Sequence, residues 1–548
     1  QRVPVAARFV VGAGEAVGFG LGGYDRAHPL TIDPFLLYRT VIGGGGADVG
    51  VAIAADAAGN VYVTGTTVSA DLPTLTPAQP NYAGTNDTFG DAFVLKLNAA
   101  GDKLIYATYL GGGKMDIGGA IAVDGAGSAV ITGVTMSDDF PLKNALQAQP
   151  GRTQGCSLSA CQHAFLTKLG ATGDALAFST YLGGNGEENL GLRLSTQHGA
   201  WRDNAAGVAI DGGGNIYVGG TTYSTDFAVT AGGAFPTKPG GASQVVLFGL
   251  KLQADGAKVL YGTYYGTGQG SNYAGGIATD GAGGMYLGGA TNDSARQLPL
   301  KNAFQPVPST AQVHAIVARF NTNASGAASF VYGSYLGGGK SNLGAGEVDI
   351  SANYALSIQA DAAGNAYVGG HTTSREFPTR NAFQAANGAD GAFLRDAFVA
   401  KINTNASGDG SLLYSSYLGG RNDDGIYGLA LGPQGDVFVA GNTALVGERD
   451  FPAKDPWASF AGLGPLAFVA RLDLSKAGAD SLVYSSGLDG QDVTVSFSGV
   501  AVDGANNAYV VGYGSEGREL GPATSGDALV LKFSPQSTRR VYLPLVTR

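Results

Sequence analysis

The chain has 548 residues, a net charge of −10 and a pI of about 5.0, and only 14% of its residues are charged. This acidic balance, with few and scattered lysines, argues against a nucleic-acid partner and against an anionic membrane surface. No apolar run approaches the roughly 20 residues that cross a bilayer, so we expect no membrane span. The 90 glycines follow no Gly-X-Y period and separate short apolar stretches, which is typical of tight turns between strands.

The first elements in chain order are AARFVVG (6–12) and AVGFGLGGYD (16–25), which predict two strands joined by a glycine turn. They precede the repeats described next, so we assign residues 1–35 to an N-terminal β extension, either a cap or the end of a preceding domain. Gln1 opens no signal-peptide pattern. Either such a segment has been removed, or the sequence begins within a longer gene product.

From residue 36 onward, one segment of roughly 74 residues recurs seven times. Its clearest copy reads LIYATYLGG (104–112), AIAVDGAGSAVITG (120–133), DFP (139–141) and HAFLTKL (163–169). Two β-branched runs around the GAG turn predict a hairpin, and the alternating HAFLTKL predicts a third strand. LAFSTYL (176–182) supplies the fourth strand. Four short antiparallel strands repeated in series predict an all-β fold, a seven-bladed β-propeller over residues 36–548.

The strand order within a blade follows from residue size. We expect the strand around Ile121, rich in small residues, to line the channel, and the strand around Tyr106 to lie outermost. The chain then offers seven inner strands but eight candidates for the outer position. We expect Leu36–Ile42 to pair with Asp527–Phe533 and so latch the ring, the rival being that VYLPLV (541–546) completes the last blade.

Four motifs recur with this spacing: YxTYLGG (106–112, 332–338, 414–420), AVDxxGN, DFP with NAFQ after it (302–305, 381–384), and DAFVxKL (91–97, 396–402). They resemble the bacterial family of β-propeller repeats called SBBP repeats, over roughly residues 17–533. The resemblance implies an exported or cell-surface protein. It implies no common enzymatic activity, since a fold alone assigns none.

Two kinds of polar residue recur in the copies. An aspartate before the inner turn occurs at Asp56, Asp124, Asp211, Asp280, Asp361 and Asp503, and a basic residue in the third strand at Lys96, Lys168, Lys251, Arg319, Lys401, Arg471 and Lys532. A calcium site needs six to eight oxygens, so we interpret each lone aspartate as a turn residue that binds nearby amides. We expect each basic residue to pair with a carboxylate, most naturally this aspartate, or with carbonyl oxygens.

Catalytic signatures are missing from the sequence. His163 and His314 occupy a strand-end slot that other copies fill with Asp91, Asp396 and Asp527, which suits a structural polar position. There is no nucleophile elbow, HExxH motif, phosphate loop or plausible triad. We therefore expect no enzymatic activity, no cofactor and no metal.

An acidic ring is the most specific candidate for a binding site. Four residues past the GG of several copies come Asp48, Asp116, Glu188, Asn342 and Asp424. Because this position precedes the inner strand, these side chains should gather at one mouth of the channel. There they would bind a cation or a basic peptide, or form a solvated rim.

Two insertions, residues 185–204 and 339–354, open onto the same face. Trp201 with Arg193 and Arg202 is a candidate anchor set for a partner, unless Trp201 packs within its own insertion. Cys156 and Cys161 predict a disulfide in a surface loop of an exported protein, and no second ligand pair accompanies them as a metal site would require.

Together these features favour a non-enzymatic, secreted or cell-surface scaffold that presents loops to proteins, glycans or copies of itself in a homo-oligomer or surface assembly. The alternative is a propeller enzyme or ligand-binding module that uses the acidic mouth for a cation, a polysaccharide or a peptide. A glycoside-cleaving enzyme of that kind needs paired carboxylates roughly 5 to 10 Å apart.

Overall fold

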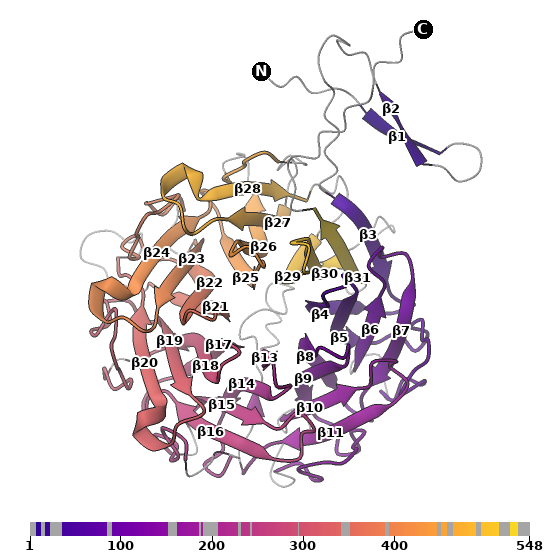
Figure 1. Ribbon diagram of the computed structural model, residues 1–548, viewed down its shortest axis with the longest axis horizontal. Coiled ribbons are helices and arrows are strands. Elements are labelled where there is room, and N and C mark those ends of the chain that lie inside the picture. Colours follow the sequence, from indigo (N-terminus) through magenta and orange to yellow (C-terminus); the bar gives the residue numbers. More distant parts are fainter. Residues whose placement is uncertain are drawn as a thin grey trace.

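The fold is known from a computed structural model of the chain. The structure describes residues 7–11, 17–21, 36–84, 90–151, 162–185, 188–189, 207–227, 229, 232–241, 244–293, 295–340, 351–389, 394–445, 451–456, 464–488, 495–514 and 526–534. Seven antiparallel sheets form a closed ring around a central axis (Figure 1), so the predicted seven-bladed propeller is confirmed.

The first three blades follow the chain from the inner to the outer strand. The first blade has β4 (Asp48–Ala55), β5 (Val61–Thr67), β6 (Asp91–Leu97) and β7 (Leu104–Leu110). The second has β8 (Asp116–Val123), β9 (Ala129–Thr135), β10 (His163–Leu169) and β11 (Leu176–Leu182). The third has β12 (Glu188–Asn189) and β13 (Gly207–Ile210), both paired with β14 (Ile216–Thr222), then β15 (Val246–Leu252) and β16 (Val259–Tyr265).

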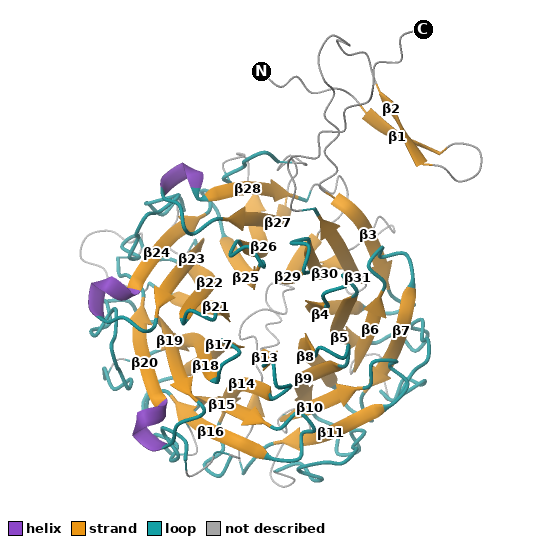
Figure 2. Cartoon of the chain, viewed as in Figure 1, coloured by secondary structure: helices purple, strands orange, loops and turns teal. Residues whose placement is uncertain are grey.

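The next three blades add a short 3-10 helix to the outer hairpin, visible at the rim in Figure 2. The fourth has β17 (Asn272–Thr279), β18 (Gly284–Thr291), β19 (His314–Asn321), η1 (Gly326–Ser329) and β20 (Phe330–Leu336). The fifth has β21 (Asn353–Ala360), β22 (Asn365–Thr372), β23 (Asp396–Asn403), η2 (Gly408–Ser411) and β24 (Leu412–Leu418). The sixth has β25 (Asp424–Leu431), β26 (Val437–Leu445), β27 (Gly464–Leu472), η3 (Gly478–Asp480) and β28 (Leu482–Gly487).

The seventh blade joins the two ends of the ring. It has β29 (Val495–Val502), β30 (Ala508–Gly514), β31 (Asp527–Phe533) and, as its outer strand, β3 (Leu36–Ile42). Tyr38 pairs with Lys532 and Ile42 with Ala528, so the predicted latch is confirmed, whereas VYLPLV lies outside the described residues. β1 (Ala7–Val11) and β2 (Val17–Leu21) form a separate hairpin, as predicted for the N-terminal extension. The division at residue 35 stays a prediction.

The inner strands meet around the axis, each contacting the inner strands of both neighbouring blades. A β-bulge interrupts six of them, for example between Gly50 and Ala52 on β4. The bulge brings the inner strand close to the second strand, where a Cβ added to Gly65 would lie 1.8 Å from the carbonyl oxygen of Val49. This close approach explains why glycine ends the repeated inner motif.

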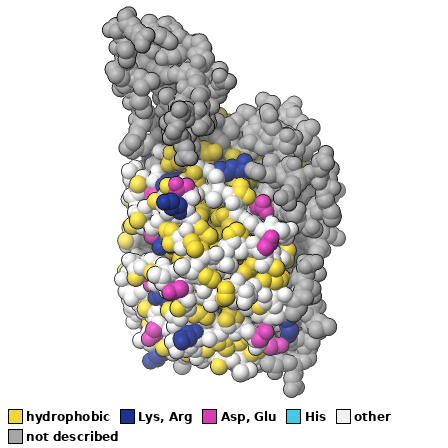
Figure 3. Space-filling model, turned by 90° about the vertical axis from the view of Figure 1, so that its right-hand side faces the viewer, with side chains coloured by type: hydrophobic (Ala, Val, Ile, Leu, Met, Phe, Trp, Pro, Cys, Tyr) yellow, Lys and Arg dark blue, Asp and Glu magenta, His cyan; other side chains and the backbone are white. Residues whose placement is uncertain are grey.

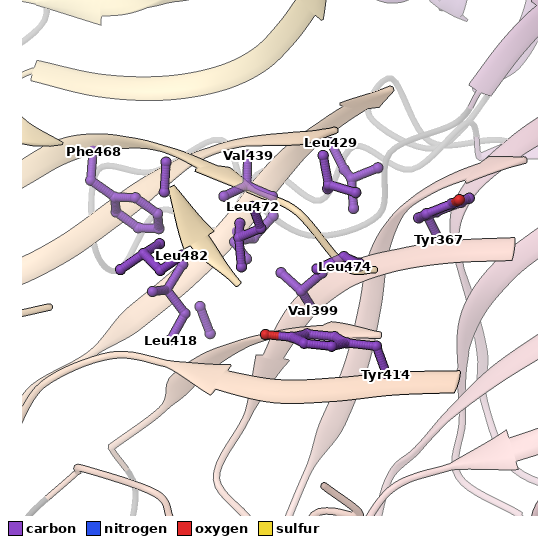
Figure 4. Packing of buried hydrophobic residues seen from close by; sticks show 14 of the residues in the cluster. Tyr367, Val399, Tyr414, Leu418, Leu429, Val439, Phe468, Leu472, Leu474 and Leu482 are labelled. Carbon is purple, nitrogen blue, oxygen red and sulfur yellow. The ribbon is translucent and has the colours of Figure 1, made fainter. Parts of the chain in front are cut away.

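The core lies between neighbouring blades. In Figure 4, Tyr414 and Leu418 of the fifth blade pack against the same cluster as Phe468 and Leu472 of the sixth. The second tyrosine of YxTYLGG adds a buried anchor. In the first blade, Tyr109 Oη donates to the carbonyl oxygen of Ser69 at 2.8 Å and fixes the connection that follows the second strand.

The first tyrosine of YxTYLGG joins one blade to the next. Tyr106 packs against the outer turn of the second blade, where Gly173 has φ +77° and an added Cβ would lie 2.2 Å from the ring. In the blades with a 3-10 helix, a serine makes the contact instead, as Tyr414 Oη and Ser481 Oγ do at 2.8 Å. The recurrence of this tyrosine therefore reflects the closure of the ring.

The outer edges of the blades are partly covered. Leu75, in the connection between β5 and β6, bridges to Ala107 of β7, which shields an otherwise open strand edge. Figure 3 shows the side of the ring where β3 and β7 lie, with apolar side chains between scattered charges. Leu37, Val41 and Ile105 are among the exposed apolar residues.

The turn aspartates and strand cations form one network, as predicted. Asp56 Oδ1 accepts bonds from the amides of Ala58 (3.0 Å) and Asn60 (2.9 Å), which confirms its role in the turn. Salt bridges join the pairs Lys168–Asp124 (2.9 Å), Lys251–Asp211 (3.6 Å), Arg319–Asp280 (3.2 Å) and Arg471–Asp436 (2.7 Å). In the sixth blade, Asp436 replaces the aspartate that the motif lacks at Gly432.

The same cations reach across to the next blade. Lys168 Nζ donates to the carbonyl oxygen of Ala254 at 3.2 Å, and Lys532 Nζ to that of Ala99 at 3.0 Å, across the latch. Lys96 and Lys401 lie over tyrosine rings, at 4.7 and 5.0 Å from the centroids. The network therefore ties neighbouring blades together on one face of the ring.

We expect Lys168→Ala to lower the free energy of unfolding by about 2 kcal/mol, because it leaves the largely buried Asp124 carboxylate without its cation. Hydrogen bonds and this lysine lower the pKa of Asp124 despite burial, so the contribution is lost as the pH falls through that lowered pKa. Lys114→Ala is the control, since the Lys114–Asp138 pair is exposed. Denaturant titration at pH 7 measures both; equal losses would contradict the prediction.

Candidate functional site

The two faces of the ring carry different connections. Because the strands of a blade alternate in direction, one face carries both tight turns of each blade, and we call it the turn face. The other, the loop face, carries the connection between the second and third strands and the links between blades. Both predicted insertions begin in such links, at residues 185 and 339, and so start on the loop face.

The predicted acidic ring lies where the inner strands begin on the loop face. The first residues of β4, β8, β12, β17, β21, β25 and β29 are Asp48, Asp116, Glu188, Asn272, Asn353, Asp424 and Val495. Four of the five predicted members therefore occupy this first-strand slot. Asn342 lies outside the described residues, and in the fifth blade the slot is held by Asn353, which pairs with Thr372 as Asp48 pairs with Thr67.

The slot carboxylates do not form a solvent-facing acidic rim. Asp48, Asp116 and Asp424 are 0%, 0% and 2% exposed. Asp116 Oδ2 accepts bonds from the Gly112 amide at 2.8 Å and from Ser137 Oγ at 2.9 Å. The expected accessible acidic mouth is therefore wrong for these three residues, because their side chains turn inward to hold the GG link. The structure does not describe the side chain of Glu188.

The remaining predicted site residues are not placed. Arg193, Trp201 and Arg202, the candidate anchor set, lie outside the described residues, and so do Cys156 and Cys161. Their partner-binding and disulfide roles stay predictions. Within the described part of the chain, no three His, Cys, Asp or Glu side chains are grouped to hold a metal ion.

Three aromatic side chains meet where the fourth and fifth inner strands begin on the loop face. The ring centroids of Tyr273 on β17 and Tyr354 on β21 are 5.9 Å apart at an interplanar angle of 61°. His371 on β22 pairs with Tyr354 in register, and its ring centroid lies 5.1 Å from that of Tyr354. Both tyrosines are half-buried and His371 is buried. We call these three residues the axial cluster.

The layer that holds the axial cluster changes character around the ring. In the second blade it is apolar, and Ile117 clusters with Met115 and Met136. In the sixth and seventh blades it carries Asn442, which is buried, and Tyr513, which is half-buried. Aromatic or polar side chains therefore occupy this layer from the fourth to the seventh blade, whereas the second blade is apolar there.

Family comparison agrees with the repeat seen in the sequence. Residues 37–73 match the model of the SBBP beta-propeller repeat. The chain carries the SBBP repeat. No curated protein matches the chain.

Several solved structures resemble this SBBP-repeat protein along most of its length. An ulvan lyase of polysaccharide lyase family PL25, bound to -[GlcA(1-4)Rha3S]-, is 11% identical, with 89% of this chain and 95% of that chain covered and a TM-score of 0.38. The polysaccharide lyase Uly1 is 8% identical, with 88% and 89% covered and a TM-score of 0.39. A luciferin-regenerating enzyme is 11% identical, with 91% and 96% covered and a TM-score of 0.31.

These findings correct the expected function. All three solved structures are enzymes, which contradicts our expectation of a non-enzymatic scaffold and of a chain without enzymatic activity. We withdraw both. Since the identities are 8–11% and the TM-scores lie below 0.5, we transfer neither substrate nor functional residues from these enzymes.

Proposed function

We propose that this propeller binds a polysaccharide on the loop face, over the axial cluster, and acts on it there. The observation that carries the proposal is the contact between Tyr273 and Tyr354 at the inner end of two neighbouring blades. Half-buried tyrosines offer a flat apolar ring with a polar edge. Sugar rings, which present C–H groups and hydroxyls side by side, are a suitable ligand for such a surface.

His371 is the group in the axial cluster best suited to move a proton. Its imidazole ring lies against Tyr354, whose phenol is a second proton donor and acceptor. Histidine is the side chain most often used for general acid–base chemistry. We assign polysaccharide contact to the two tyrosines and proton exchange to His371.

The location of the proposed site agrees with the organisation of the propeller. The links between blades lie on the loop face, and such loops commonly form the binding surface of repeat proteins. Export to the cell surface or beyond would bring the protein to polysaccharide, and we include it in the proposal. Among the described residues, no helix has the length and hydropathy of a membrane span.

We expect Tyr354→Ala to weaken polysaccharide binding at least tenfold, because it removes the central ring of the cluster. His371→Gln should retain binding but lose turnover. Tyr513→Ala, at the corresponding layer of the seventh blade, is the matched control. Affinity electrophoresis on a panel of polysaccharides, with release of new reducing ends, measures binding and turnover. Equal binding by wild type and Tyr354→Ala would contradict the site, and binding without turnover would contradict the catalytic part.

A further inference from the structure

A second feature of the loop face has no part in polysaccharide binding. At every junction, the third strand of one blade contacts the inner strand of the next. The first-strand slot therefore faces the residue that opens the preceding third strand, which we call the third-strand slot. In chain order the facing pairs are Asp91–Asp116, His163–Glu188, Val246–Asn272, His314–Asn353, Asp396–Asp424, Leu466–Val495 and Asp527–Asp48.

At three junctions, the carboxyl groups of two aspartates lie close to the same glycine. A Cβ added to Gly111 would lie 2.8 Å from both Asp91 Oδ1 and Asp116 Oδ2. A Cβ added to Gly419 would lie 2.8 Å from Asp396 Oδ1 and 2.7 Å from Asp424 Oδ2. A Cβ added to Gly43 would lie close to the carboxyl groups of Asp527 and Asp48. The two acids of each junction are therefore neighbours, although they belong to different blades.

The first of these pairs is buried without a compensating cation. Asp91 and Asp116 are both 0% exposed. Asp91 Oδ2 accepts the Ala83 amide at 2.8 Å, while Asp91 Oδ1 is buried and has no hydrogen-bond partner among the described residues. Thr135 is a hydroxyl donor near Asp116, and it lowers the pKa of Asp116 less than burial raises it. No described lysine or arginine forms a salt bridge with either acid. Two adjacent buried carboxylates cannot both stay ionised at low cost.

The groups around the pair also lack positive charge. Besides burial, the negative charge of Asp139, from the connection after β9, raises the pKa of Asp91. Besides burial, Asp91 raises the pKa of Tyr109 on β7, and Asp116 raises that of Tyr181 on β11. Burial raises the pKa of Asp91 to about 6 and that of Asp116 to about 7, while backbone and hydroxyl donors act in the opposite direction. The two acids titrate as a pair.

The donors around the acids favour a proton over a metal ion. The contacts to Oδ2 come from amide N–H groups and from Ser137, whereas calcium needs six to eight oxygen ligands. A single proton held between the two acids removes one of the two buried negative charges without any metal ion. At two other junctions the third-strand slot holds His314 opposite Asn353 and Val246 opposite Asn272, so no second acid is present there.

We propose that Asp91 and Asp116 share one proton across the first blade junction, and that the ring is thereby stabilised in mildly acidic solution. Because the folded acids hold the proton to a higher pH than unfolded aspartates do, the contribution is complete below about pH 4, the ordinary pKa of aspartate. It is lost as the pH rises from there through about 6 to 7. Loss of this proton loosens the junction between the first and second blades.

Asp116→Asn tests the shared proton, because an amide donates to Asp91 at every pH and asparagine already fills this slot at Asn272 and Asn353. The melting temperature of the wild type should fall by at least about 3 °C between pH 5.5 and 8.5. Asp116→Asn should melt higher than wild type at pH 8.5, and no higher at pH 5.5. Asp91→Asn should behave alike. Asp138→Asn, an exposed acid, is the control for net charge.

Infrared spectra report the protonation of the carboxyl groups directly, whatever the effect of a substitution on stability. The wild type should show the carbonyl band of a protonated carboxylic acid at pH 6, reduced in Asp116→Asn. Equal melting shifts at both pH values, or a wild-type melting temperature that rises with pH, would overturn the proposal. So would a calcium-dependent rise at pH 8.5 that Asp116→Asn abolishes, because the pair would then bind a cation.

Discussion

Deletion of residues 1–42 should lower the free energy of unfolding by at least about 5 kcal/mol, because it removes the outer strand of the seventh blade. β3 pairs with β31 along its length. Ile42 is buried in the core between the seventh and first blades, and Tyr38 packs against the same cluster. Thr40 Oγ1 also donates to the carbonyl oxygen of Gly101 in the first blade at 2.7 Å, so β3 joins both blades.

The control for this deletion is removal of residues 1–35, which leaves β3 intact. Among the described residues, β1 and β2 pair only with each other, so we expect this shorter deletion to change the melting temperature little. Calorimetry measures both proteins. A restored transition on adding a peptide of residues 36–42 would support the latch, and similar melting of the two deletions would contradict it.

Gly133→Ala should destabilise the second blade by about 3 kcal/mol. An added Cβ would lie 1.9 Å from the carbonyl oxygen of Ile117 and 2.8 Å from the ring of Phe165. Neither obstacle is the end of a flexible side chain: one is backbone on the bulged inner strand, and the other is a buried ring. The backbone of β8 or β9 must therefore shift to accept the methyl group.

Gly125→Ala is the matched control, in the turn of the same hairpin. A Cβ there meets nothing within 4 Å, so we expect a change below about 0.5 kcal/mol. Denaturant titration measures both variants. If Gly133→Ala were as stable as Gly125→Ala, the close approach of the inner and second strands would be contradicted.

The sequence predicted the architecture well because its strongest signals are local and repeated. Tyr106 recurs since each copy must close against the next blade, and Asp124 recurs since each inner turn needs an acceptor for its amides. Lys168 recurs because it meets that aspartate and the neighbouring blade. A residue that every copy keeps reports on the junctions, and the junctions fix the ring.

The candidate site could not be predicted in the same way. Spacing placed Asp116 at the start of an inner strand, but the direction of its side chain depends on the Gly112 amide and Ser137, which is remote in sequence. In the fifth blade, counting from the GG link gave Asn342 rather than Asn353, because the link there is longer. The axial cluster was missed, although Tyr273 and Tyr354 stand where other copies carry Val49 or Ile117. Disagreement between copies at that position was the available signal.

Hydrogen exchange measured by mass spectrometry, with and without a bound polysaccharide, tests the proposed site most directly. The account predicts slower exchange in peptides that cover the loop-face ends of β21 and β22, around Tyr354 and His371, and no change in the tight turns of the opposite face. Protection confined to the turn face or to the outer strands, with none at β21 and β22, would contradict it.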